Sequence, residues 1–438
     1  MQFLIPSVLV LIGMTQPIGE EKVDPPKEQK FQLDNGLTVL LRPVQGAKDT
    51  ALVVLFSIGG DQDRQGRSGT AHLIEHLYVT AAAGNERART ADELIQRYPK
   101  GWNAQTGDRY TVIATVFPGS DLEKELQEAA ARMGDLRVTA SDLTREKPRV
   151  LEELGNMFGR IPSLGASNLA RELVRPTPRN GRKGGQPEHI SLITLQETQD
   201  RWRRYYKPKN AILVLAGALD NITARKAVQD SFGGIASGEA APPPAEAGKP
   251  KSGAIQEVPV EPLPSLKDSE ICLAYAAPAP TSELYAPFLV LMGRLWTGAA
   301  KLENKPGRMP VRFAPLDDPE VVHIGSSVHK GESAKEAEQR LTTFVKDAIK
   351  PKLDPGEINR LKLQFGFFLG FADQPDSLLA GNPYGVAFSL GRRQQLGINS
   401  DKLKKTLEQI TEKELRQAAQ QVFDPEQHAS AVVWIRPK

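Results

Sequence analysis

The chain has 438 residues, of which 40% are hydrophobic and 25% charged, which is typical of a soluble globular protein with two to four domains. Its net charge of +3 argues against a dedicated nucleic-acid-binding protein. The single cysteine, Cys272, excludes an intramolecular disulfide and a cysteine-rich metal cluster, so a metal site would have to use His, Asp or Glu.

The N-terminus begins with an apolar run over residues 3–14. This run is too short to span a bilayer but has the length of a signal-peptide core. No Lys or Arg precedes it and no A-x-A cleavage site follows it, so an apolar tail packed on the fold is the alternative. We predict a signal peptide and lead-in over residues 1–25, with export to the periplasm or cell envelope. A cytoplasmic location is the alternative.

Strands and helices alternate irregularly along the first half, which favours an α+β fold over a doubly wound sheet. The pattern predicts a hairpin at 31–43 with Asn35-Gly36 as its two-residue turn. It also predicts strands at 50–60 and 109–117, and helices at 68–79, 90–99, 121–133 and 140–157.

An internal repeat suggests that the chain is duplicated. Thr194 with Glu197 and Thr411 with Glu414 each predict a capping box at the start of a helix. A proline follows 14 residues after each threonine, and an apolar strand comes next. We therefore predict two tandem homologous α+β domains that form a clam-like chain. Their predicted limits are 26–233 and 254–438, joined by a Pro/Ala-rich linker at 234–253.

The sequence His72-Leu-Ile-Glu75-His76 carries the clearest chemical signal. Two histidines at i and i+4 lie on one helix face, within reach of a single tetrahedral Zn²⁺. Glu75 borders that face, which suits a general base acting on a metal-activated water.

A catalytic zinc needs a third protein ligand, and a carboxylate is the natural choice in a chain with one cysteine. The predicted helix at 140–157 offers Glu146, Glu152 and Glu153. We choose Glu153 as the ligand and Glu146 as an assisting carboxylate, because they share one helix face. Pro148 lies between them and predicts a kink that would disturb the alignment of Glu146 more than that of Glu153.

These residues resemble the insulinase/pitrilysin family of zinc metallopeptidases, which includes the mitochondrial processing peptidases and bacterial relatives. The matching segments are 57–77, 101–111 and 145–154. The resemblance implies one Zn²⁺ per chain bound by His72, His76 and Glu153, with Glu75 and Glu146 in catalysis. It also implies that Asn103 and Ala104 lie on a strand beside which a peptide substrate binds. The implied fold is a duplicated α+β domain, and such chains commonly form dimers.

The second half has no copy of the metal motif, because the repeat offset carries His72 to Leu289. We therefore expect a non-catalytic half. The family often places an Arg/Tyr pair from this half near the substrate, and Tyr384 and Arg392 are candidates. A solvated helix end is the interpretation that we favour for them.

We predict a zinc endopeptidase that acts on peptides or unfolded polypeptides, with a homodimer or a heterodimer with a related chain as its possible assemblies. The alternative is a non-catalytic scaffold or partner subunit of an insulinase-type peptidase complex. A non-peptidase metal hydrolase and a structural protein with incidental histidines are further alternatives.

Overall fold

The computed structural model describes residues 28–155, 162–176, 184–245, 248–249, 251, 255–260, 268–302, 310–350, 352, 354, 356–370, 381–424 and 428–435. The predicted signal peptide at 1–25 lies outside these ranges. Among the helices that these ranges contain, none combines the length and the apolar character that a membrane span requires.

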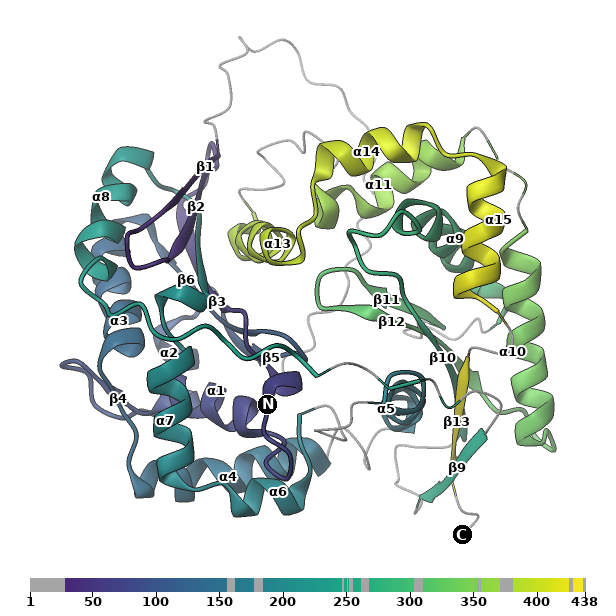
Figure 1. Ribbon diagram of the computed structural model, residues 1–438, viewed down its shortest axis with the longest axis horizontal. Helices are drawn as coiled ribbons and strands as arrows, with labels where there is room; N and C mark the ends of the chain where they lie inside the picture. The colour runs from purple at the N-terminus through teal and green to yellow at the C-terminus, as the bar shows by residue number, and fades with distance from the viewer. Residues whose placement is uncertain are drawn as a thin grey trace.

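Two mixed β-sheets, one in each half of the chain, stand side by side with helices packed against them (Figure 1). The first sheet has six strands and the second has five, with antiparallel and parallel pairs in both. This arrangement confirms the predicted α+β fold with two similar halves. In spatial order the first sheet contains β1 (Gln29–Gln32), β2 (Thr38–Pro43), β8 (Ala211–Gly217), β3 (Asp49–Phe56), β6 (Thr111–Pro118) and β5 (Trp102–Thr106). The second contains β11 (Val311–Ala314), β12 (Asp318–Ser327), β10 (Glu270–Ala276), β13 (Ala429–Ile435) and β9 (Ile255–Val260).

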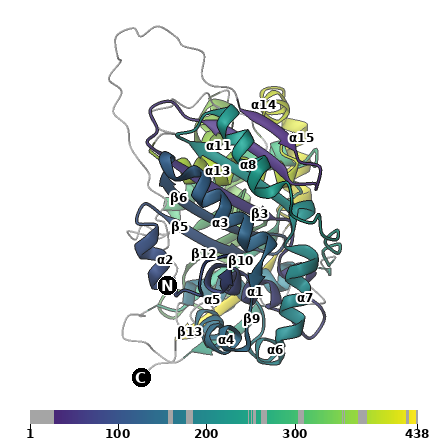
Figure 2. The same ribbon diagram turned by 90° about the vertical axis from the view of Figure 1, so that its left-hand side faces the viewer.

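Helices cover one face of each sheet with residues of their own half. The large apolar cores between sheet and helices bury alternate strand residues, such as Leu52, Val54 and Phe56 of β3. Figure 2 looks onto the first half, where α3, α7 and α8 lie in front of the sheet. The helices that contribute to the first core include α1 (Thr70–Thr80), α3 (Leu122–Gly134), α4 (Ala140–Gly155), α7 (Leu195–Tyr205) and α8 (Asn221–Phe232). Those of the second core include α9 (Tyr285–Gly298), α10 (Ala334–Ala348), α11 (Glu357–Leu369), α14 (Ser400–Glu408) and α15 (Glu412–Val422).

The opposite face of each sheet is covered by a helix from the other half of the chain. Helix α13 (Pro383–Leu396) packs Val386, Ala387 and Leu390 against the first sheet. Helix α5 (Pro162–Val174) packs against β10, β12 and β13 of the second sheet. Both positions are visible in Figure 1, where α5 lies beside β10 and β13. The two halves therefore exchange one helix each. The exchanged helix buries the sheet face that the helices of the same half leave uncovered.

The structure confirms the repeat that the sequence predicts. Thr194 and Thr411 cap α7 and α15, and in each case the side chain of the third helical residue returns the capping bond. Strands β8 and β13, which follow these helices in the chain, both lie in the interior of their sheets. The described residues of 234–253 form neither helix nor strand, and the domain limits at 233 and 254 stay predictions.

The predicted hairpin at 31–43 is present as β1 and β2, but its turn differs from the prediction. The amide of Gly36 donates to the carbonyl of Leu33, so Asp34 and Asn35 are the central residues of the turn. Gly36 follows with a φ of 92°, and it closes a three-residue loop rather than forming a two-residue turn. The Asn35 amide is used elsewhere, because it donates to the carbonyls of Phe232 and Ile235. The other helices and strands predicted for the first half are observed, including α2 (Ala91–Arg97) within 90–99.

Candidate metal centre

Helix α1 carries the two histidines, and a neighbouring carboxylate sets where it begins. Its N-cap, Gly69, has a φ of 88° and no side chain with which to cap the helix. Asp63 supplies that cap by accepting hydrogen bonds from the amides of Gly69 and Ala71, at 2.8 and 3.1 Å. Asp63 is fully buried and pairs with Arg201 at 2.9 Å. Burial raises the pKa of Asp63 to about 6, against the opposing effect of Arg201.

The side chains of α1 and α4 converge at one point. Nε2 of His72 lies 3.3 Å from Oε2 of Glu153, and Nε2 of His76 lies 3.6 Å from Oε1 of the same carboxylate. All three ligand atoms lie within 4.8 Å of one another. Glu152, the alternative on α4, is exposed to solvent. The structure thus brings together His72, His76 and Glu153 from helices about 70 residues apart in sequence.

Both imidazoles have a second contact on the ring nitrogen that faces away from Glu153. Nδ1 of His72 lies 3.3 Å from the carbonyl oxygen of Gly184, and Nδ1 of His76 lies 3.4 Å from Oε2 of Glu146. With a proton on Nδ1, each ring donates to its oxygen acceptor and keeps the Nε2 lone pair for a metal.

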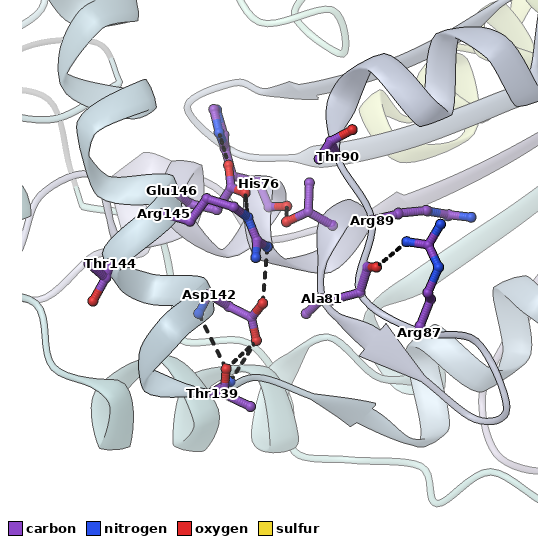
Figure 3. A network of polar contacts seen from close by, with 12 residues as sticks. His76, Ala81, Arg87, Arg89, Thr90, Thr139, Asp142, Thr144, Arg145 and Glu146 are labelled. Carbon is purple, nitrogen blue, oxygen red and sulfur yellow. Dashed lines mark hydrogen bonds and ion pairs between the residues drawn. The ribbon is translucent and has the colours of Figure 1, made fainter.

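Glu146 is itself held by a polar network on α4, shown in Figure 3. Arg145 donates to Oε1 of Glu146 at 2.8 Å and pairs with Asp142 at 3.0 Å. Asp142 accepts from the backbone amide and the hydroxyl of Thr139. This network restrains the carboxylate that contacts His76.

Helix α4 runs unbroken through Pro148, contrary to the predicted misalignment of Glu146. Glu146 is completely buried and reaches His76, while Glu153 reaches both histidines. Pro148 lies on the exposed face of the helix, so the chain accommodates the missing donor without moving either carboxylate from the site.

Glu75 lies on α1 beside the histidines and faces β5. Oε2 of Glu75 accepts a hydrogen bond of 2.7 Å from the hydroxyl of Thr106. The side chain is buried, and burial raises the pKa of Glu75 above its usual range although both histidines oppose the shift. One carboxylate oxygen is therefore fixed, and the group is electrostatically suited to exchanging a proton.

The charge and donor types of this cluster fit a divalent zinc ion. Three carboxylates surround two imidazoles, so a dication would neutralise a local excess of negative charge. Burial would lower the pKa of His76, but hydrogen bonds to Glu146 and Glu153 outweigh it and raise this pKa to about 10. In a tetrahedral zinc site, ligand atoms at about 2.0–2.1 Å from the metal stand roughly 3.3–3.4 Å apart. The distances of 3.3 and 3.6 Å from Glu153 to the two imidazoles are of this size.

Asn103 and Ala104 lie in β5, at the edge of the first sheet. Ala104 packs against the first core, and Nδ2 of Asn103 donates to the hydroxyl of Tyr384 at 3.0 Å. Tyr384 and Arg392 both face the first half from α13, so a solvated helix end was the wrong interpretation for them. Arg392 is buried with its guanidinium 3.8 Å from the ring centre of Tyr110.

Sequence reasoning assigned no role to Gly184 or Thr106. Gly184 acts through a backbone carbonyl, for which a sequence contains no signal. Thr106 belongs to the 101–111 segment that carries the family resemblance, and a polar residue two positions after Ala104 on the same strand face was the available signal.

Comparisons with known proteins agree with this architecture. A sequence model described as the Peptidase M16 inactive domain matches residues 192–304, a segment that contains the end of the first half and the start of the second. The zinc protease PqqE of Helicobacter pylori is 27% identical over 206 residues, covering 45% of this chain and 44% of that protein. A probable mitochondrial-processing peptidase subunit beta of Arabidopsis thaliana is 22% identical over 212 residues, covering 48% and 40% respectively. These matches thus span less than half of each relative.

Solved structures extend the likeness over the whole fold. A protease from Helicobacter pylori has a TM-score of 0.77 at 19% identity and covers 94% of this chain and 100% of that one. The first half of the periplasmic protease PqqL from Escherichia coli has a TM-score of 0.68 at 15% identity, covering 94% and 92%. Fold and site together define a chain of two M16-like domains, and among the described residues the candidate metal centre lies in the first. In sequence and in fold, the chain resembles the insulinase/pitrilysin family, M16.

Proposed function

We propose that this protein is a zinc-dependent endopeptidase that hydrolyses bonds within peptides or unfolded polypeptides. The observation that carries the proposal is the placement of both imidazole Nε2 atoms against the Glu153 carboxylate, with Glu75 beside them. His72, His76 and Glu153 would hold one Zn²⁺ per chain. When bound, zinc supplies a Lewis acid that polarises the scissile carbonyl and acidifies the attacking water.

Glu75 acts as the general base in this mechanism. Its carboxylate takes the proton of the attacking water and later returns a proton to the leaving amine. Thr106 fixes Oε2, which leaves Oε1 to receive the proton. Glu146 assists by holding Nδ1–H of His76, so that the ring keeps its orientation.

The edge strand β5 would place the substrate. Only one side of β5 pairs with a strand, β6, among the described residues. An extended peptide can add to such an edge through main-chain hydrogen bonds beside Asn103 and Ala104. This mode of binding requires an extended substrate, which is why we propose peptides and unfolded segments.

A direct test compares zinc content and peptide cleavage in the wild type, Glu75→Gln and His72→Ala. Glu75→Gln should keep stoichiometric zinc and lose cleavage of a quenched peptide library by roughly 10²–10⁴-fold. His72→Ala should lose both. Unchanged cleavage by Glu75→Gln, or equal zinc in wild type and His72→Ala, would refute the proposal.

The second candidate is a non-catalytic scaffold or partner subunit. Two observations favour it: the match to a family model described as inactive, and a relative described as a subunit. Such a protein should purify without stoichiometric zinc and cleave no peptide alone. Its mass in solution, alone and with a related chain, separates a monomer from a homodimer or heterodimer.

We also propose export, since PqqL is described as periplasmic and residues 3–14 have the length of a signal-peptide core. Cell fractionation with N-terminal sequencing of the mature protein tests this. An intact Met1 in the cytoplasmic fraction would contradict it.

A further inference from the structure

Strand β5 has two faces, and each contacts a different part of the molecule. Successive side chains of a strand point to opposite faces. Ala104 and Thr106 face the first core and α1, where Thr106 donates to Glu75. Asn103 and Gln105 alternate with them and face the second half.

Both of these outward side chains donate hydrogen bonds to the second half. Asn103 donates to Tyr384 of α13. The Nε2 atom of Gln105 donates to Oδ1 of Asp317, a half-buried residue immediately before β12. The same oxygen of Asp317 accepts a hydrogen bond from the hydroxyl of Tyr110.

Asp317 thus contacts both ends of the loop that connects β5 to β6 in the first sheet. Gln105 precedes Thr106 in β5, and Tyr110 immediately precedes β6, with which Thr106 pairs at Thr111. Since β5 lies at the edge of its sheet, β6 is the strand that holds it on one side. The contact with Asp317 is therefore a restraint that the second half adds at the position of Thr106.

We propose that Asp317 is a positioning residue for Glu75, and that it acts through the end of β5. By holding Gln105 and Tyr110, it keeps Thr106 where its hydroxyl fixes the carboxylate of the base. The second half, which supplies none of the three candidate zinc ligands, thereby contributes to hydrolysis at the first half. This inference rests on the proposed peptidase function.

The physical expectation is a loss in turnover with little loss in substrate affinity. A displacement of a reacting group by about 1 Å can lower a rate roughly 10²-fold. Asp317→Ala should therefore lower kcat by about 10- to 100-fold, with KM changed less than about threefold and zinc content unchanged. Asp317→Asn keeps an oxygen acceptor at the same place, so it should retain most of the activity.

A matched control is Asp318→Ala, which removes the neighbouring carboxylate. Asp318 pairs with Arg171 of α5 at 3.2 Å, so it is a second carboxylate at the junction of the halves, with a partner on another element. It should keep kcat within about threefold of the wild type. An equal loss in both variants would show a general effect of the junction and overturn the assignment.

A double-mutant cycle with Thr106→Val tests the route of the effect. Thr106→Val removes the hydroxyl and keeps the shape of the side chain. If Asp317 acts through Thr106, then Asp317→Ala should cause no further loss of kcat in the Thr106→Val background. Independent, multiplicative losses would refute the route.

The proposal can fail separately from the proposed function. A wild type without zinc and cleavage would refute the peptidase function itself. A wild type that cleaves peptides, with Asp317→Ala equally active, would refute only the role of Asp317. Should Asp317→Ala not fold, the Gln105→Ala/Tyr110→Phe variant removes both donors instead, and it must show the same loss of kcat and the same non-additivity with Thr106→Val.

Discussion

At the scale of single residues, the candidate metal centre depends on the contacts that each imidazole makes through the ring nitrogen facing away from Glu153. His76 has a carboxylate partner that a sequence pattern can indicate, because Glu146 lies on the same helix face as Glu153, two turns earlier. His72 instead uses the carbonyl of Gly184. Outer contacts of this kind typically change metal affinity by roughly 10–100-fold when they are lost.

Gly185 holds the segment that carries the Gly184 carbonyl. It has a φ of 110°, and a Cβ placed there would lie 2.6 Å from Cα of Gly69. We predict that Gly185→Ala shifts this segment, weakens zinc binding by roughly 10–100-fold and lowers stability. Competition with a fluorescent zinc chelator measures the affinity.

Gly46→Ala is the matched control for this change. Gly46 also has a positive φ, 77°, but nothing lies within 4 Å of its Cβ position. Gly46→Ala should introduce a backbone strain similar to that of Gly185→Ala, and it should leave the affinity for zinc unchanged. Equal zinc affinity in both variants would contradict a role for the Gly184 carbonyl.

Lys207 allows a test of burial through pH. Its ammonium lies 3.8 Å from the ring centre of Trp202 and donates to the carbonyl of Met133 at 2.6 Å. Burial lowers the pKa of Lys207 to about 8, with Arg203 adding to the shift. Between this value and the ordinary value of 10.5, the unfolded chain binds more protons than the folded one, so stability from this group rises with pH.

We predict that the free energy of unfolding of the wild type rises relative to Lys207→Met as pH increases from 8 to 10.5. The shift of the pKa corresponds to roughly 3 kcal/mol over this window. Urea unfolding at several pH values measures the difference. Lys226→Met, at an exposed lysine, should show no such rise, and a flat difference for Lys207→Met would contradict the buried environment.

At the scale of elements, α4 is the helix whose geometry the sequence left in question. Its proline does not displace either carboxylate, because the helix packs Leu143, Val150 and Leu154 into the first core on both sides of it. Packing of an amphipathic face outweighs the single missing hydrogen bond.

We predict that Pro148→Ala raises the free energy of unfolding by about 1–2 kcal/mol. The missing helical hydrogen bond is restored, while the more flexible unfolded chain offsets part of the gain. Glu152→Ala, at another exposed position of α4, should change stability by less than about 0.5 kcal/mol. A loss of stability or zinc in Pro148→Ala would mean that the proline shapes the site.

At the scale of the whole molecule, the exchange of α5 and α13 makes the two halves interdependent. Without α13, the first sheet would expose one apolar face, and without α5 the second sheet would do the same. A large apolar surface exposed to solvent favours aggregation.

We predict that residues 28–249 and 251–438, produced separately, are aggregated or lack cooperative unfolding, and that co-expression restores a soluble complex. Size-exclusion chromatography and thermal unfolding measure this. As a control, an intact chain cut after folding at a protease site placed within 234–253 should stay associated. Two monomeric, cooperatively folded fragments would contradict the interdependence.

The sequence by itself determined the features that depend on neighbours along the chain. The spacing of His72 and His76, about one helical turn, places both rings on one helix face, and the spacing of Glu146 and Glu153, about two turns, does the same for the carboxylates. The capping boxes at Thr194 and Thr411 revealed the duplication for the same reason, since a cap involves residues three apart. The hairpin turn shows the limit, because the side chain of Asn35 is drawn into contacts with Phe232 and Ile235 from far along the chain.

Only the tertiary structure decided which distant groups meet. The helix exchange, the carbonyl of Gly184 at His72 and the link from Asp317 to the end of β5 all join residues more than 100 positions apart. Such contacts follow from how whole sheets and helices pack, which depends on the sum of many small apolar contacts rather than on any local pattern. Helix periodicity, which depends on local hydrogen bonding, therefore made the candidate metal motif predictable from the sequence. Tertiary packing determined which distant groups contact its side chains.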